Sequence, residues 1–185
     1  MFIQTEATPN PTTLKFVPGK QVLASGTKDY RNPDEAKTES PLAARLFEVD
    51  GVEGVFFGPD FISVTKGAGD WQHLKPMILG AIMDHYMSDS PVLTGEQAQS
   101  TTEEKSFGEH QATVDTIKEL LETRVRPAVA QDGGDIVFHD YQEGVVYLHM
   151  RGACAGCPSS TATLQNGIEN LLKHYLPDIK EVRPA

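Results

Sequence analysis

Near its C-terminus the chain reads Gly152-Ala153-Cys154-Ala155-Gly156-Cys157-Pro158, a stretch that contains both of its cysteines. Two thiolates at this spacing can bind one metal centre or close a small redox disulfide. Residues 145–150 before them predict a strand, and Ser159-Ser160-Thr161 after them is typical of a helix start. We therefore expect both cysteines on a loop that enters a helix N-terminus, where backbone N–H groups and the helix dipole favour thiolates and any anionic cluster bound to them.

Length, charge and cysteine content narrow the class of protein. The 185 residues fit one domain or two small ones, and the net charge of −10 argues against nucleic acid as a partner. We expect no membrane association either, because no apolar run approaches the roughly 20 residues of a membrane span. Two cysteines form no disulfide framework, which indicates a reducing compartment.

The first residues, Met1-Phe2-Ile3-Gln4, resemble neither a signal peptide nor an Arg-rich presequence. We therefore expect the bacterial cytoplasm. A mitochondrial matrix protein whose presequence has been removed would show the same features.

The apolar pattern predicts an α+β fold in two small domains joined by a flexible acidic linker. The first domain covers residues 1–88, the linker 89–109 and the second domain 110–185. The linker has few apolar residues, and Lys105 alone balances the carboxylates at 89, 96, 103, 104 and 109. Such a segment buries too little apolar surface to become ordered.

In the first domain we expect two strands, a turn-rich segment, a helix, a hairpin and a final helix. The two strands cover residues 2–5 and 14–17, and the turn-rich segment covers 24–40. The first helix covers 41–47, the hairpin joins 52–57 to 61–66, and the final helix covers 71–87. Ser40 and Asp70 stand at the N-cap positions of the two helices, and Pro41 stands at the first helical position. One apolar face of the last helix comprises Leu74, Met77, Ile78, Ala81, Ile82 and His85.

The second domain has the pattern α-β-β-α-β. Its first helix starts near Thr113, and Pro127 inside it predicts a kink or break near Arg126. The helix face comprises Ile117, Leu120, Leu121, Val125, Ala128 and Val129. A hairpin over residues 135–150 turns at Gln142-Glu143-Gly144. The apolar face of the next helix comprises Leu164, Ile168, Leu171, Leu172 and Tyr175, and residues 179–182 form a last strand.

Other polar motifs favour structural roles. Asp132-Gly133-Gly134-Asp135 is more typical of a helix end and turn than of a phosphate or metal loop. His139 and His149 fall on the hairpin strands opposite the apolar face, which predicts that they face solvent. None of the six histidines has ligand spacing to the cysteines. The cysteine pair itself suits iron–sulfur ligation best, with a redox disulfide, zinc binding and a structural role as alternatives.

The second domain resembles the C-terminal domain of NifU, the Nfu domain. The resemblance rests on Arg126-Pro127, Asp132-Gly133-Gly134-Asp135, the strand pair, and the cysteine stretch continued by Ser159-Ser160 and Thr163-Leu164. Residues 5–11 with Leu14-Lys15-Phe16 resemble the N-terminal domain of mitochondrial-type Nfu proteins. Full-length NifU also has a scaffold domain with its own cysteines and a ferredoxin-like domain, and neither is present in this sequence.

The resemblance implies an iron–sulfur cluster carrier and not an enzyme. Such a carrier holds a cluster on Cys154 and Cys157 and transfers it to apo-proteins, with upstream assembly factors as further partners. A cluster usually takes four thiolates, so a homodimer that brings two cysteine pairs together would complete the site. The resemblance favours [4Fe–4S], and [2Fe–2S] is the other type. A thiol-disulfide oxidoreductase that uses the same pair is the alternative function, and the cysteine-free first domain is expected to dock partners.

Overall fold

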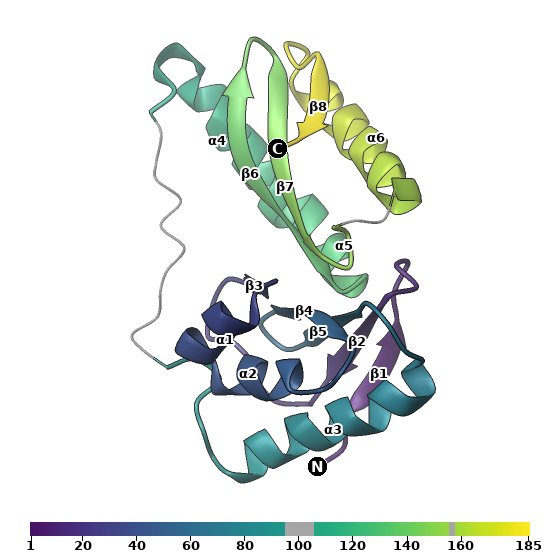
Figure 1. Cartoon of the computed structure of the whole chain (residues 1–185). Coiled ribbons are helices and arrows are strands. Elements are labelled where there is room, and N and C mark those ends of the chain that lie inside the picture. The colour runs from purple at the N-terminus through teal and green to yellow at the C-terminus, as the bar shows by residue number, and fades with distance from the viewer. Residues whose placement is uncertain (95–105, 156–157) are drawn as a thin grey trace. The chain divides into compact units, whose positions relative to one another are not determined.

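The computed structural model describes residues 1–94, 106–155 and 158–185. The chain divides into two compact units, Met1–Thr101 and Thr102–Ala185, and each combines one sheet with helices (Figure 1). The expected α+β fold of both parts is confirmed. No described helix is both long and apolar enough to cross a membrane.

The first unit contains a sheet in the strand order β1-β2-β5-β4-β3, and the printed strand pairs run antiparallel. Its strands are β1 (Gln4–Ala7), β2 (Thr13–Val17), β3 (Lys28–Tyr30), β4 (Val52–Phe57) and β5 (Ile62–Lys66), and its helices are α1 (Pro33–Glu39), α2 (Pro41–Phe47) and α3 (Trp71–Met87). The core forms where Phe16, Phe57 and Ile62 of the sheet meet buried side chains of α2 and α3. The expected hairpin and both expected helices are present at the expected residues.

Three details of the first unit differ from expectation. The turn-rich segment 24–40 contains β3 and α1, and the Asn32 side chain caps α1 by accepting a hydrogen bond from the Asp34 N–H at 3.0 Å. The first strand begins at Gln4, because its pairing with β2 starts at Gln4 and Val17. On α3, Asp70 stands at the expected N-cap position but its side chain makes no capping hydrogen bond, and Met77 is half exposed, so its assignment to the apolar face was wrong.

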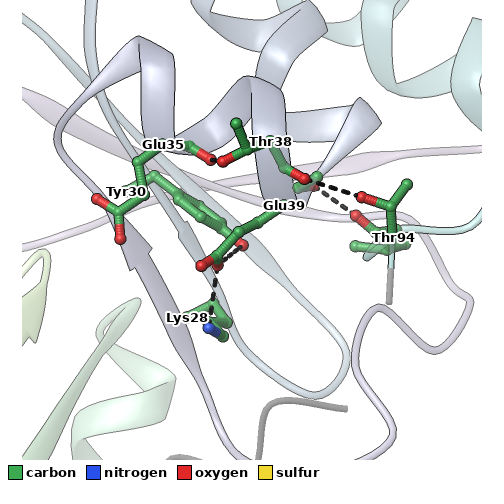
Figure 2. A network of polar contacts seen from close by, with 8 residues as sticks. Lys28, Tyr30, Glu35, Thr38, Glu39 and Thr94 are labelled. Atoms are coloured by element: carbon green, nitrogen blue, oxygen red, sulfur yellow. Dashed lines mark hydrogen bonds and ion pairs between the residues drawn. The ribbon is translucent and has the colours of Figure 1, made fainter. Parts of the chain in front are cut away.

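The residues that follow α3 are attached to the first unit (Figure 2). Val92 and Leu93 pack against its core, and the Ser40 hydroxyl donates to the Val92 carbonyl. The Thr94 N–H and hydroxyl donate to the carbonyls of Glu39 and Thr38 at 2.8 and 3.2 Å. A linker start at residue 89 is therefore too early, since residues 92–94 contact residues about fifty positions earlier.

The linker is also shorter than expected at its other end. Phe107 packs edge-on against Phe138 in the second core, with ring centroids 5.7 Å apart. The Phe107 N–H donates to the Gln111 side chain at 3.1 Å. The rest of the expected linker, residues 95–105, lies outside the described residues, and the division into two domains and a flexible linker remains a prediction.

The second unit follows the expected order α-β-β-α-β. Its elements are the short 3₁₀ turn η1 (Gly108–His110), α4 (Gln111–Leu120), the π-helical turn η2 (Leu121–Val125), α5 (Arg126–Gln131), β6 (Gly134–Gln142), β7 (Val145–Gly152), α6 (Pro158–Tyr175) and β8 (Glu181–Pro184). The sheet has the order β6-β7-β8, with β8 parallel to β7. The core joins one face of this sheet to α4, α5 and α6 (Figure 1).

The form of the helix break, two exposed side chains and the hairpin turn differ from expectation in this unit. The break predicted at Pro127 is the π-helical turn, after which Pro127 stands in the first turn of α5. Ala128 is exposed and Tyr175 is 45% exposed, so neither belongs to the buried face to which it was assigned. The hairpin loop has two residues, because Gln142 pairs with Val145, and Glu143 and Gly144 both have positive φ as a type I′ turn requires.

Helix α6 supplies hydrogen bonds to the edge strand β8. The Gln165 side chain donates to the Val182 carbonyl, and the Val182 N–H donates to the Glu169 carboxylate at 3.3 Å. These two contacts satisfy the backbone groups of Val182 by means of a helix. Lys173 also contacts Glu169, and its hydrogen bond together with the Val182 N–H lowers the pKa of the Glu169 carboxyl.

The first unit should lose stability as the pH falls below about 6.5. His85 on α3 is fully buried, and neither ring nitrogen has a hydrogen bond of normal length. Burial and the charge of Arg45 lower its pKa, against a smaller opposing effect of the Ser90 backbone. As the pH falls, His85 therefore takes up a proton in the unfolded chain before it does so in the folded chain. The stability of the first unit is complete above the pKa that His85 has in the unfolded chain, and it decreases as the pH drops below that value.

Urea unfolding between pH 5 and pH 7.5, followed by fluorescence of Trp71, measures this dependence. His85→Leu should flatten it, whereas His73→Leu, at an exposed position on the same helix, should not. An equally steep pH dependence in His85→Leu would assign the effect to other groups.

Candidate functional site

Cys154 lies in the turn that follows β7. Its side chain is 7% exposed and packs in the core of the second unit. Cys154 lies on the loop after β7, as expected, but it packs against the core, because the chain turns at Gly152, with φ of 65°, and directs Cys154 back toward the start of β6. Cys157 lies outside the described residues, so its position relative to Cys154 remains a prediction.

Gly134 forms the surface against which Cys154 rests. A Cβ atom added at Gly134 would lie 2.7 Å from the Cys154 Sγ and 2.9 Å from the Arg151 carbonyl. Gly134 also pairs with Gly152 across the hairpin, and the Ala153 N–H donates to the Gly133 carbonyl at 3.2 Å. The turn at residues 132–135 therefore links the end of α5 to the cysteine loop. The sequence predicted this turn but gave no sign of its contact with Cys154.

Gly134→Ala should displace the Cys154 sulfur. A contact of 2.7 Å is impossible for a real Cβ, and the backbone carbonyl on its other side prevents the alanine from moving away. We expect a loss of stability of about 1–3 kcal/mol, as for other overpacked sites, together with faster thiol alkylation. Iodoacetamide labelling followed by mass spectrometry measures the exposure of Cys154. Gly167→Ala, where a Cβ meets nothing within 4 Å, is the matched control; equal labelling of both variants would contradict this role for Gly134.

A buried ion pair fixes the residue next to Gly134. Arg126 donates from Nε and Nη2 to the two carboxylate oxygens of Asp135 at 2.9 and 3.1 Å, and its Nη1 contacts Glu122. Burial lowers the pKa of the Arg126 guanidinium, but hydrogen bonds and charges from Asp135 and Glu122 outweigh it and raise the pKa above its ordinary value. The pair joins the first turn of α5 to the first residues of β6, on which the cysteine loop rests.

His139 and His149 lie on the exposed face of the hairpin, as expected. Their ring centroids are 4.4 Å apart and the ring planes are 77° apart. Burial, the His139 charge and the Arg151 charge lower the pKa of His149. Among the described residues, no group of three or more His, Cys, Asp and Glu side chains is arranged to hold a metal ion.

Each of the two units combines one sheet with helices, and both cysteines fall between β7 and α6. Two family models match the chain: "Scaffold protein Nfu/NifU N terminal" over residues 3–89 and "NifU-like domain" over residues 117–183. The chain belongs to the Nfu/NifU family of iron–sulfur cluster scaffold proteins, which are carriers and not enzymes.

Relatives of the chain include three mitochondrial proteins. The human "NFU1 iron-sulfur cluster scaffold homolog, mitochondrial" is 48% identical over 184 residues, which cover 98% of this chain and 71% of the human protein. The Drosophila sechellia protein of the same name is 50% identical, and "NifU-like protein 4, mitochondrial" of Arabidopsis thaliana is 49% identical. This chain spans 64% and 65% of the lengths of these two.

A solution structure of a NifU-like protein from Saccharomyces cerevisiae also matches part of the chain. It is 29% identical, covers 52% of this chain and 87% of its own, and has a TM-score of 0.46.

Proposed function

We propose that this protein binds an iron–sulfur cluster through Cys154 and Cys157 and transfers it to apo-proteins. The observation that carries the proposal is membership of the scaffold family, in a chain whose two cysteines both fall in the loop between β7 and α6. The dipole and first N–H groups of a helix favour a negatively charged cluster. Upstream assembly factors would load the cluster.

The number of thiolate ligands that a cluster needs favours a dimer of this chain. One chain has two cysteines, whereas a [4Fe–4S] or [2Fe–2S] cluster usually takes four thiolates. Two chains that face each other at this loop supply four, and we favour [4Fe–4S]. The burial of Cys154 is compatible with this role, because a ligand sulfur needs to be open only on the side that faces iron.

Transfer to a client is a ligand exchange. A client thiol loses its proton and forms an Fe–S bond, the bond between iron and Cys154 breaks, and the released cysteine takes up a proton. No electron is transferred overall. Gly134 and Gly152 favour this exchange, because the sulfur rests against backbone on one side and its loop leaves β7 at a residue with positive φ.

The buried position of Cys154 makes it a poor attacking thiol for the thiol-disulfide oxidoreductase alternative. Disulfide exchange requires a thiolate that a substrate disulfide can reach, whereas Cys154 packs in the core of the second unit. In that alternative the attack would therefore fall to Cys157.

The first unit has no cysteine and, on this proposal, docks client proteins or assembly factors. The partly exposed methionines of α3, Met77, Met83 and Met87, support this role, because methionine adapts to differently shaped partners. The bacterial cytoplasm remains our prediction for the compartment; the mitochondrial names belong to the relatives.

Cluster binding and dimerisation should be one coupled event. Iron ligation that occurs only in the dimer drives association by mass action, so loss of the cluster to a client should release monomers. The charge of −10 per chain opposes association, and moderate salt should strengthen it by screening.

Anaerobic sedimentation of apo and cluster-loaded protein, with iron and sulfide counted per chain, tests the coupling. The expected result is one cluster per two chains in the loaded dimer. A monomer that carries a full cluster, without glutathione or another small thiol as ligand, would refute the dimer site. Transfer of the cluster to an apo-ferredoxin, followed by circular dichroism, tests the carrier function itself.

A further inference from the structure

The contact between His139 and His149 lies at an irregularity in the hairpin. Strands β6 and β7 pair in regular register from Gly134 opposite Gly152 to Phe138 opposite Leu148, and then the register shifts so that Asp140 lies opposite Tyr147. His139 is the extra residue of this β-bulge, and bulges commonly redirect a side chain. The two imidazoles are in contact across the strands, with centroids 4.4 Å apart.

The histidine pair and the cysteine belong to opposite sides of the second unit's sheet. Leu148 and Cys154 are part of its core, whereas His139 and His149 are exposed. Neighbouring side chains along a strand point to opposite faces, so His149 and Leu148 must diverge. The histidine pair is therefore not part of the proposed cluster site.

The ring geometry suits two nitrogen ligands of one ion. Zinc–nitrogen bonds are about 2.0–2.1 Å, so the two ligand nitrogens must come within about 4 Å of each other on adjacent corners of the coordination shell. The two ring centroids are 4.4 Å apart with planes 77° apart, which is close enough for one nitrogen of each ring to bind the same ion. Imidazole prefers Zn²⁺, Cu²⁺ and Ni²⁺ over the hard cations Mg²⁺ and Ca²⁺.

The surroundings limit the strength of such a site. The Arg151 charge is near enough to His149 to repel a cation, and the Asp140 carboxylate accepts hydrogen bonds from the Tyr141 N–H and the Gln142 side chain. Two protein ligands also leave coordination positions for water or for a donor from another molecule.

We propose that His139 and His149 form an open surface site for a divalent transition-metal ion that prefers imidazole, such as Zn²⁺. The site uses one nitrogen from each ring across the β6–β7 hairpin. It binds metal independently of the cysteine loop.

Zn²⁺ titration of the full-length, untagged Cys154→Ser/Cys157→Ser protein tests the proposal, because this background has no thiolates to compete for the ion. Calorimetry should show one Zn²⁺ per chain, and ¹⁵N NMR should show shifts of the ring nitrogens of His139 and His149. His139→Asn and His149→Asn, each added to this background, should weaken binding by at least about tenfold because each leaves one ligand.

His174→Asn is the matched control. It removes an exposed histidine of the same unit whose ring contacts Tyr175 and not a second histidine. Unchanged Zn²⁺ affinity in this control, with circular dichroism unchanged in all variants, supports the site. Absence of saturable binding in the cysteine-free background would overturn it, as would equal affinity in His139→Asn, His149→Asn and the background.

Discussion

Cys154→Ser and Cys157→Ser should each reduce cluster-bound iron to the level of the double variant. If each chain of a dimer contributes two of four thiolates, removing one from each chain leaves half of the ligand set. A serine hydroxyl does not replace a thiolate, because iron in these clusters is held by sulfur. Iron and sulfide analysis after anaerobic reconstitution, with the absorbance of the brown cluster, measures the loss.

Two substitutions of the buried Cys154 distinguish an effect on folding stability from the loss of a cluster ligand. Cys154→Ser places a hydroxyl among core side chains, which should cost about 1–3 kcal/mol, whereas Cys154→Ala adds no polar atom. Both variants should lose the cluster to the same extent despite this difference in stability. Wild-type iron in either would show that the ligands lie elsewhere, and a colourless wild-type protein that reduces disulfides would support the oxidoreductase alternative.

Arg126→Leu should destabilise the second unit by about 3 kcal/mol, the lower end of the range for one partner removed from a buried ion pair. The substitution leaves the Asp135 carboxylate buried at 3% exposure without the bidentate arginine. Arg126 itself is partly exposed, so water entering the site limits the loss. The displaced carboxylate should also disturb the neighbouring Gly134 and the cysteine loop.

Glu122→Gln is the control for this prediction. It removes the exposed partner of the same arginine and should cost no more than about 0.5 kcal/mol. Denaturant unfolding followed by NMR signals of the second unit measures both changes, since Trp71 reports on the first unit alone. Equal stability of Arg126→Leu and the wild type would show that the ion pair contributes no net free energy to folding and would overturn the prediction.

Local signals predicted the elements well where the chain has strong helix starts and alternating strands. Ser40-Pro41 and Pro127 marked a helix start and a break at the correct residues. The missed elements β3 and α1 are short and have few apolar residues, although Asn32-Pro33 was an available helix-start signal. Val92 and Leu93 were assigned to the linker, because their contacts are with residues distant in sequence.

The cysteine pair was evident from spacing, whereas its surroundings were not. The contact of Gly134 with Cys154 and the Arg126–Asp135 pair depend on how α5 enters β6, and no local periodicity encodes this. The contact between His139 and His149 lies at a bulge, which the alternation of the strands did not predict. The sequence therefore proposes which residues bear the chemistry, whereas the contacts that support Cys154 became visible in the structure alone.

The attachment of β8 to α6 has a consequence for how two copies of this protein can meet. An uncovered edge strand offers N–H and C=O groups to which a second chain can add its own strand. At β8, Gln165 and Glu169 already bind the backbone of Val182, and Pro184 has no N–H to donate. Growth of one continuous sheet across two molecules is thus opposed at this edge, which protects against strand-by-strand aggregation and leaves other surfaces for pairing.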